Sequence, residues 1–69
     1  MNTIEIVVND QAMQVPEGTT IEGLLDQLKV NSPAIAVEVN QVLRPRNDFS
    51  ISVLSSGDCL EIVTLVGGG

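Results

Sequence analysis

The chain has 69 residues with no His, Trp or Tyr, one Cys, and 9 acidic residues against 3 Lys and Arg, a formal net charge of -6. This length suits one small domain, because a chain of about 60 residues buries only about 60% of its unfolded surface. The absence of His excludes a Ser-His-Asp triad and an imidazole base, and one Cys without His provides no usual zinc site. We therefore expect no metal site and no catalytic residue. If the chain takes part in a reaction, we expect it to do so as a substrate, carrier or partner of an enzyme.

The acidic balance also restricts partners and location. Without Trp or Tyr to stack on bases, an acidic chain is not expected to bind nucleic acid, nor an anionic membrane surface. No apolar run approaches the ~20 residues of a membrane span, and Met1-Asn2-Thr3 does not open a signal peptide. One unpaired Cys fits a reducing compartment. We expect a cytoplasmic protein.

Residues 4–8 and 12–15 alternate apolar and polar side chains, and the first run is β-branched apart from Glu5. Asn9-Asp10-Gln11 lies between them, and Asn and Asp tolerate left-handed backbone conformations. These segments predict a β-hairpin.

Residues 19–29 predict a short amphipathic helix. Thr19-Thr20-Ile21-Glu22 is typical of a capping box, in which the Thr19 hydroxyl accepts from the Glu22 amide and the Glu22 side chain returns the bond. Apolar residues at helical spacing form one stripe: Ile21, Leu24, Leu25 and Leu28. The helix is expected to end near Lys29. Gly23 costs about 1 kcal/mol relative to Ala, which we attribute to close approach of a neighbouring segment.

The second half predicts strands at 34–39, 42–43 and 59–66. The last run carries few charges, which suits a strand flanked on both edges. Pro45 has no amide to give a ladder and excludes a central strand around it, and Phe49 is expected to fill the core beneath this irregular stretch.

The order is therefore β-β-α-β-β-β, with 51–54 as a further short extended piece. The apolar stripe of the helix is expected to cover one face of a small mixed sheet, which makes an α+β domain. We place this single domain at 1–66 and a flexible glycine tail at 67–69.

Gly67-Gly68-Gly69 follows the last predicted strand. Glycines carry the largest backbone entropy and no side chain to pack, so we expect them to leave the sheet as a mobile tail. Bare backbone can enter a narrow active-site channel that a Cβ would block, and it can deliver the Gly69 carboxylate there. A frayed terminus is the alternative, and composition favours neither.

Several segments, taken in chain order, carry a family resemblance: Asn9-Asp10, Gly18-Thr19-Thr20-Ile21 with Leu24-Leu25, Ala36–Asn40, Arg44-Pro45-Arg46, Gly57-Asp58 and Glu61–Gly69. The ordered set covers the whole chain. It resembles the ubiquitin-like β-grasp family and, within it, the ThiS-type sulfur carriers of thiamin biosynthesis.

The resemblance implies a carrier cycle rather than an enzyme. A ThiF-type enzyme would use ATP to adenylate the Gly69 carboxylate, with Gly67 and Gly68 threaded into its active site. A cysteine desulfurase or another persulfide donor would then supply sulfur, leaving a thiocarboxylate for thiazole synthase. The carrier itself would bind no cofactor.

Three other functions stay open at this point. The chain could supply sulfur for molybdopterin or another cofactor, or it could be a ubiquitin-like modifier joined to lysines through Gly69. It could also be an interaction domain with inert glycines.

The remaining residues are interpreted more simply. Cys59 is expected to act as a small apolar side chain rather than a reactive thiolate. Arg44 and Arg46 are expected to be solvated loop charges or to pair locally with Asp48, and contact with a partner or with phosphate is the less favoured alternative. Residues beside the tail are assigned either to the core or to a partner-docking patch: Val63, Leu65 and Val66.

Overall fold

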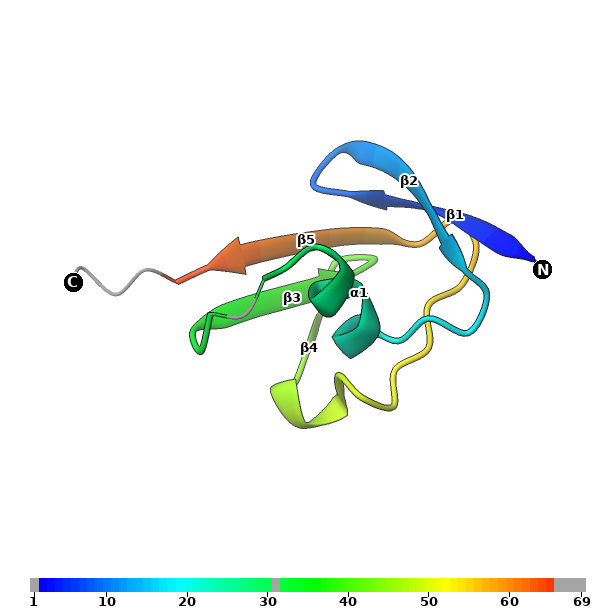
Figure 1. Cartoon of the computed structure of the whole chain (residues 1–69). Coiled ribbons are helices and arrows are strands. Elements are labelled where there is room, and N and C mark those ends of the chain that lie inside the picture. Colours follow the sequence, from blue (N-terminus) through cyan, green and yellow to red (C-terminus); the bar gives the residue numbers. More distant parts are fainter. Residues whose placement is uncertain (1, 31, 66–69) are drawn as a thin grey trace.

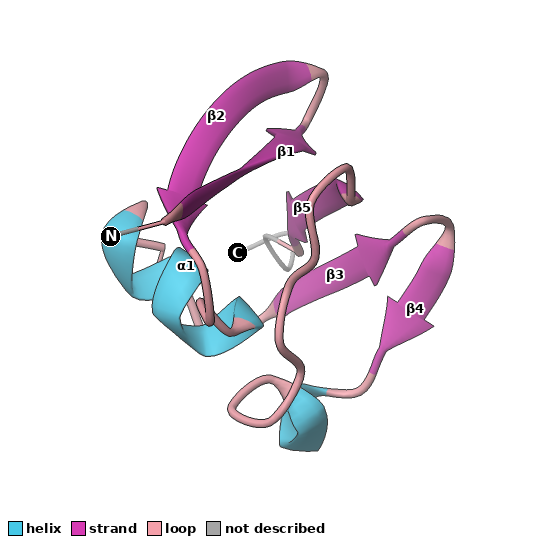
Figure 2. Ribbon diagram, turned by 90° about the vertical axis from the view of Figure 1, so that its right-hand side faces the viewer, coloured by secondary structure: helices cyan, strands magenta, loops and turns pink. Residues whose placement is uncertain are grey.

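The computed structural model describes residues 2–30 and 32–65, in which one α-helix packs on one face of a five-stranded sheet (Figures 1 and 2). The elements in chain order are β1 (Thr3–Val8), β2 (Gln11–Pro16), α1 (Ile21–Gln27), β3 (Ile35–Val39), β4 (Val42–Arg44), the 3-10 helix η1 (Arg46–Asp48) and β5 (Cys59–Thr64). The predicted α+β class and the order β-β-α-β-β-β are confirmed. Within the described residues, no helix has the length and apolar character needed to cross a membrane.

The strand order in the sheet is β2-β1-β5-β3-β4. β5 runs parallel to β1 and antiparallel to β3, so the sheet is mixed and its last strand is central, as its scarcity of charges predicted. Figure 1 shows β5 running away from the end of the molecule where β1 begins. The carboxyl end of β5 therefore emerges from the middle of the sheet.

The core lies between the sheet and α1. Its buried residues come from both layers and from the loops that close them: Ile6, Val8, Val15, Ile21, Leu24, Leu25, Val37, Val39, Phe49, Leu54 and Leu60. Burial of such an apolar side chain stabilises a fold by about 1.5–3 kcal/mol. Phe49 fills the core as predicted, and the opposite face of the sheet has no helix on it in the described chain (Figure 2).

Two tight turns give the sheet its hairpins. Asn9 and Asp10 have φ of 49° and 69°, and Asn40 and Gln41 have φ of 52° and 69°. Positive φ at both central residues matches the right-handed twist of the flanking strands, and Asn and Asp tolerate it better than most residues. The predicted turn between β1 and β2 is confirmed.

The start of α1 lies one residue later than predicted, so the capping box at Thr19 is wrong. The Thr20 side chain caps the helix, accepting from the Gly23 amide at 3.1 Å. The Thr19 hydroxyl instead donates to the Pro16 carbonyl at 2.6 Å, and the Glu22 amide donates to the Phe49 carbonyl at 3.0 Å. One partner of the predicted box is thus used by a local contact three residues earlier in the chain, and the other by a tertiary contact.

The end of α1 also comes earlier than predicted, at Gln27. Lys29 has φ 60°, and its amide donates to the Asp26 carbonyl while the Val30 amide donates to the Leu25 carbonyl. This pair of bonds is a Schellman ending, formed here around a lysine in the left-handed region. Leu28 consequently lies at the edge of the core and is 36% exposed.

Gly23 does not mark a close approach, so that interpretation is wrong. A Cβ at this position would lie 3.5 Å from Thr20 Oγ1 and 3.7 Å from Thr19 Cγ2, which are ordinary contacts. The residue is exposed on α1. Nothing in the structure explains a glycine here.

The extended piece at 51–54 pairs with the start of the helix rather than with the sheet. Val53 forms an isolated bridge with Thr20, and the Leu54 amide donates to the Thr19 carbonyl at 2.9 Å. Leu54 is buried by this arrangement. The segment therefore closes one end of the core.

Candidate functional site

The residues expected to carry the chemistry, Gly67, Gly68 and Gly69, lie outside the described residues, as does Val66. The structure does describe the root of this tail, by which we mean residues 62–65. On the β3 side, Thr64 pairs with Ile35, and the Leu65 amide donates to the Ala34 carbonyl at 2.6 Å. The strand that leads to the glycines is thus held by β3 to its last described residue.

On the β1 side, the root is held by a side chain. β1 pairs with β5 only as far as Val8 and Leu60, because the chain then turns at Asn9 into β2. The Asn9 amide donates to the Leu60 carbonyl at 2.9 Å. Its side chain then accepts from the Ile62 amide at 2.8 Å and donates to the Ile62 carbonyl at 3.2 Å. Asn9 was predicted only as a turn residue, and the sequence offers no signal for this contact 53 residues away.

Beside the root lies an exposed apolar patch on the sheet face opposite α1. Val63 is 50% exposed and Leu65 is 55% exposed. Ala36 is the cross-strand partner of Val63, and Leu43 on β4 is 64% exposed. Of the two assignments left open by the sequence, core or surface, the structure places Val63 and Leu65 at the surface.

Acidic residues adjoin this patch. Glu61 on β5 and Glu38 on β3 are direct cross-strand partners, and both are exposed. Like charges directly opposite each other destabilise a sheet. We use the name open face for this surface, defined by Ala36, Glu38, Leu43, Glu61, Val63 and Leu65.

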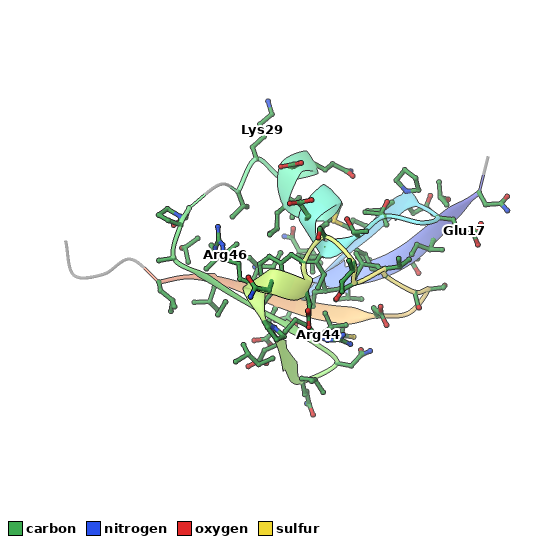
Figure 3. All side chains as sticks on the ribbon, turned by 90° about the horizontal axis from the view of Figure 1, so that it is seen from below. Glu17, Lys29, Arg44 and Arg46 are labelled. Carbon is green, nitrogen blue, oxygen red and sulfur yellow. The ribbon has the colours of Figure 1, made fainter. Side chains whose placement is uncertain are left out.

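The 3 basic side chains of the chain belong to other surfaces. Lys29 projects into solvent beyond α1 (Figure 3). Arg44 pairs with the buried Val37, which places it on the helix side of β4, and its Nε is buried without a hydrogen-bond partner among the described residues. Arg46 donates from Nη1 to the Pro33 carbonyl at 3.2 Å, so it fixes the loop before β3; of the two expectations for it, the pairing with Asp48 is not formed among the described residues.

Cys59 is exposed at the beginning of β5. It does not pack in the core, because it alternates with the buried Leu60 and points to the opposite side of the sheet. Six residues of extended chain, about 20 Å, separate it from Leu65. The structure therefore does not bring this thiol to the root of the tail.

Comparison with known proteins accounts for these features together. The sequence profile of the ThiS family matches residues 2–69. The chain belongs to the ThiS family. The sulfur carrier protein ThiS of Escherichia coli K12 is 33% identical over 66 residues, which is 96% of this chain and 100% of that protein.

Two further ThiS-related proteins extend the likeness. The crystal structure of the thiamine biosynthesis protein ThiS of Geobacter metallireducens superposes with a TM-score of 0.81 at 29% identity, over 96% of this chain and 100% of that one. A thiazole synthase of Paramagnetospirillum magneticum is 35% identical over 66 residues, and this chain spans 20% of its length. The resemblance to ThiS-type carriers and the β-grasp fold are both confirmed.

Proposed function

We propose that this chain carries sulfur for thiazole formation in thiamin biosynthesis as a thiocarboxylate at Gly69. The observation that supports this best is the family match, which runs through the terminal glycines to residue 69. The central position of β5 adds to it, because a strand held between β1 and β3 gives the tail a rigid root. The chain supplies the carbonyl carbon and the tether, and partner enzymes supply the catalytic groups.

The chemistry needs activation first. A carboxylate is anionic and resonance-stabilised, so it is a poor electrophile. A ThiF-type enzyme joins the Gly69 carboxylate to the AMP portion of ATP and releases pyrophosphate. The terminal sulfur of a persulfide, formed by a cysteine desulfurase or another donor, then attacks the acyl carbon and AMP leaves. Reduction of the resulting acyl disulfide by a thiol gives the thiocarboxylate.

Glycine is the residue that this cycle requires at the tail. Without Cβ atoms, Gly67 and Gly68 pass through a channel narrow enough to exclude water and other side chains from the acyl adenylate. Cys59 takes no part, since it lies at the far end of β5, about 20 Å from Leu65.

The open face is the docking surface in this proposal. Val63 and Leu65 supply exposed apolar area directly beside the tail, and Val66, which was also predicted for docking, lies outside the described residues. Glu38 and Glu61 add negative charge on the same face, which attracts a basic partner and speeds association at low salt.

Thiazole synthase is the proposed sulfur acceptor. The thiazole synthase of Paramagnetospirillum magneticum contains a segment similar to 96% of this chain within a protein of which it forms one fifth. A carrier-like segment in the same polypeptide as the synthase supports an encounter between the two when they are separate chains.

Intact-protein mass spectrometry tests the proposal. The chain is incubated with the adenylating enzyme, ATP and a persulfide donor, and the expected product has one oxygen replaced by sulfur. A variant lacking Gly68 and Gly69 keeps its fold and its original mass. An unchanged mass for the full chain, with an enzyme competent on another carrier, contradicts the proposal. Rescue of a thiamin auxotroph, but not of a molybdopterin auxotroph, identifies the pathway.

A further inference from the structure

We infer that Asn9 is a positioning residue for the tail: its side chain clamps β5 at Ile62 and fixes the point from which the C-terminal segment extends. The role in sulfur transfer rests on the proposed function, whereas the clamp itself does not. Asn9 lies in the β1–β2 turn, far from the glycines in sequence, and belongs to neither the core nor the open face.

The clamp continues a parallel ladder after its strand has ended. The backbone of β1 reaches Leu60 through the Asn9 amide, and the chain then turns away. The carboxamide of Asn9 presents one acceptor and one donor to the Ile62 amide and carbonyl, at 2.8 Å and 3.2 Å. A longer β1 would offer the same two kinds of group, a carbonyl acceptor and an amide donor, from two different peptide units. Side-chain amides carry the same donor and acceptor types as backbone, so the substitution is chemically complete.

The backbone conformation of Asn9 makes this geometry available. Its φ of 49° directs the side chain back along β5 while the main chain reverses into β2. Glycine would satisfy the turn equally well and would leave Ile62 without the clamp. The two requirements, a left-handed turn residue and an amide side chain, are met together by Asn.

The clamp affects how many residues separate Gly69 from the last residue that the sheet holds. Four residues, 66–69, follow Leu65, which at about 3.3 Å per residue reach about 13 Å from a fixed root. If β5 frayed back to Leu60, nine residues would be free. Effective concentration falls roughly as the -3/2 power of tether length, so this fraying lowers the concentration of the carboxylate at a docked active site about threefold.

The chain contains a matched control at the other end of β5. Asn40 also lies in a positive-φ turn, at 52°, and its side chain accepts from the Cys59 amide at 3.0 Å and donates to Asp58 Oδ1 at 3.0 Å. Asn40→Gly removes contacts of the same kind from the start of the strand. Asn9→Gly removes them from its exit.

The test compares amide hydrogen exchange and adenylation in the full-length wild type, Asn9→Gly and Asn40→Gly. Loss of the Asn9 bonds is expected to raise exchange at the Ile62 amide about tenfold, and Asn40→Gly to leave that amide unchanged. With the adenylating enzyme and ATP, kcat/KM is expected to fall in Asn9→Gly by up to about threefold, the limit of complete fraying, because β3 still pairs with β5, and to stay at the wild-type value in Asn40→Gly.

Each outcome decides a separate point. Equal exchange at Ile62 in the two variants overturns the clamp. Protection lost only in Asn9→Gly, with equal adenylation in both variants, overturns the positioning role. Absence of adenylation in the wild type overturns the proposed function, and exchange still decides the clamp. If Asn9→Gly does not fold, Asn9→Asp replaces it, since it keeps the acceptor for the Ile62 amide and loses the donor to the Ile62 carbonyl.

Discussion

The two faces of β5 differ in what their residues do. On the side toward α1, Leu60 is 1% exposed and Ile62 packs against the core. On the other side, Glu61 and Val63 are exposed, and Glu61 opposes another carboxylate. The first face buries apolar side chains in the core. The second face carries an unfavourable pair of like charges and exposed apolar side chains. The core and the proposed docking surface are therefore supplied by alternate residues of one strand.

This division follows from the geometry of a strand that is central in the sheet but covered on one side. Successive side chains point to opposite faces, so a single run of sequence serves two surfaces without conflict. Substitutions on one face should therefore change stability, and substitutions on the other should change association. The following predictions test that separation.

Leu60→Ala should produce the largest change, a loss of about 2–5 kcal/mol in the free energy of unfolding, because it opens a cavity in the core. Chemical denaturation measures this loss. Cys59→Ala, the adjacent residue on the exposed side, should change stability by less than about 0.5 kcal/mol. Similar losses in the two variants would contradict the division between the faces.

Val63→Asp should weaken binding to the adenylating enzyme about tenfold, near 1.4 kcal/mol, because it places a charge in the apolar patch beside the tail. Calorimetry or surface plasmon resonance gives the affinity. Val42→Asp is the control, since Val42 is 57% exposed but pairs with the buried Val39 on the other side of the sheet. Equal weakening by both would show that the open face is not the docking surface.

Gly23→Ala should raise stability by about 0.5–1 kcal/mol, because it removes the entropic cost of glycine in α1 at a position with room for a Cβ. Adenylation should be unchanged, since α1 lies on the side away from the open face. Thermal unfolding provides the measurement. Gly18→Ala serves as the opposite case, because Gly18 has φ 93° and the substitution should destabilise the protein.

Glu61→Lys should have the smallest effect on stability, a gain of about 0.5 kcal/mol, as it replaces a like-charge pair with Glu38 by an opposite one. Its association with a basic partner should become slower at low salt. Glu17→Lys makes the same change in net charge at the far end of the molecule from the carboxyl end of β5 (Figure 3). Stopped-flow rates that fall equally in both variants would assign the effect to net charge alone.

The predicted elements succeeded where a repeating pattern was long enough to read. Alternation located β1, β3 and β5, and apolar spacing located α1 with its buried Ile21 and Leu24. The errors in the bounds of the helix fell at its two ends. Thr19 matched a capping box locally, but its hydroxyl donates to the Pro16 carbonyl three residues earlier. The Glu22 amide donates to the Phe49 carbonyl, a contact that no local pattern contains.

Some residues of the candidate site were likewise predicted from the sequence, and others were not. The glycine run and the family resemblance pointed to Gly69 from the sequence, and the family is confirmed, while the role of Gly69 remains a prediction. The sequence left open whether Val63 and Leu65 are buried or exposed, because an apolar residue in a strand can lie on either face of a sheet. Asn9 was recognised as a turn residue only.

By itself, the sequence determined the classes of chemistry that are absent from this chain, the order of its elements and its resemblance to ThiS-type carriers. The first two depend on composition and on short-range periodicity, and the resemblance depends on motifs in chain order, all of which are complete in the linear chain. The tertiary structure decided which face of β5 is covered and which residue holds its exit. Both depend on contacts between segments as much as 53 residues apart, and such contacts form only when the sheet brings Asn9 beside Ile62.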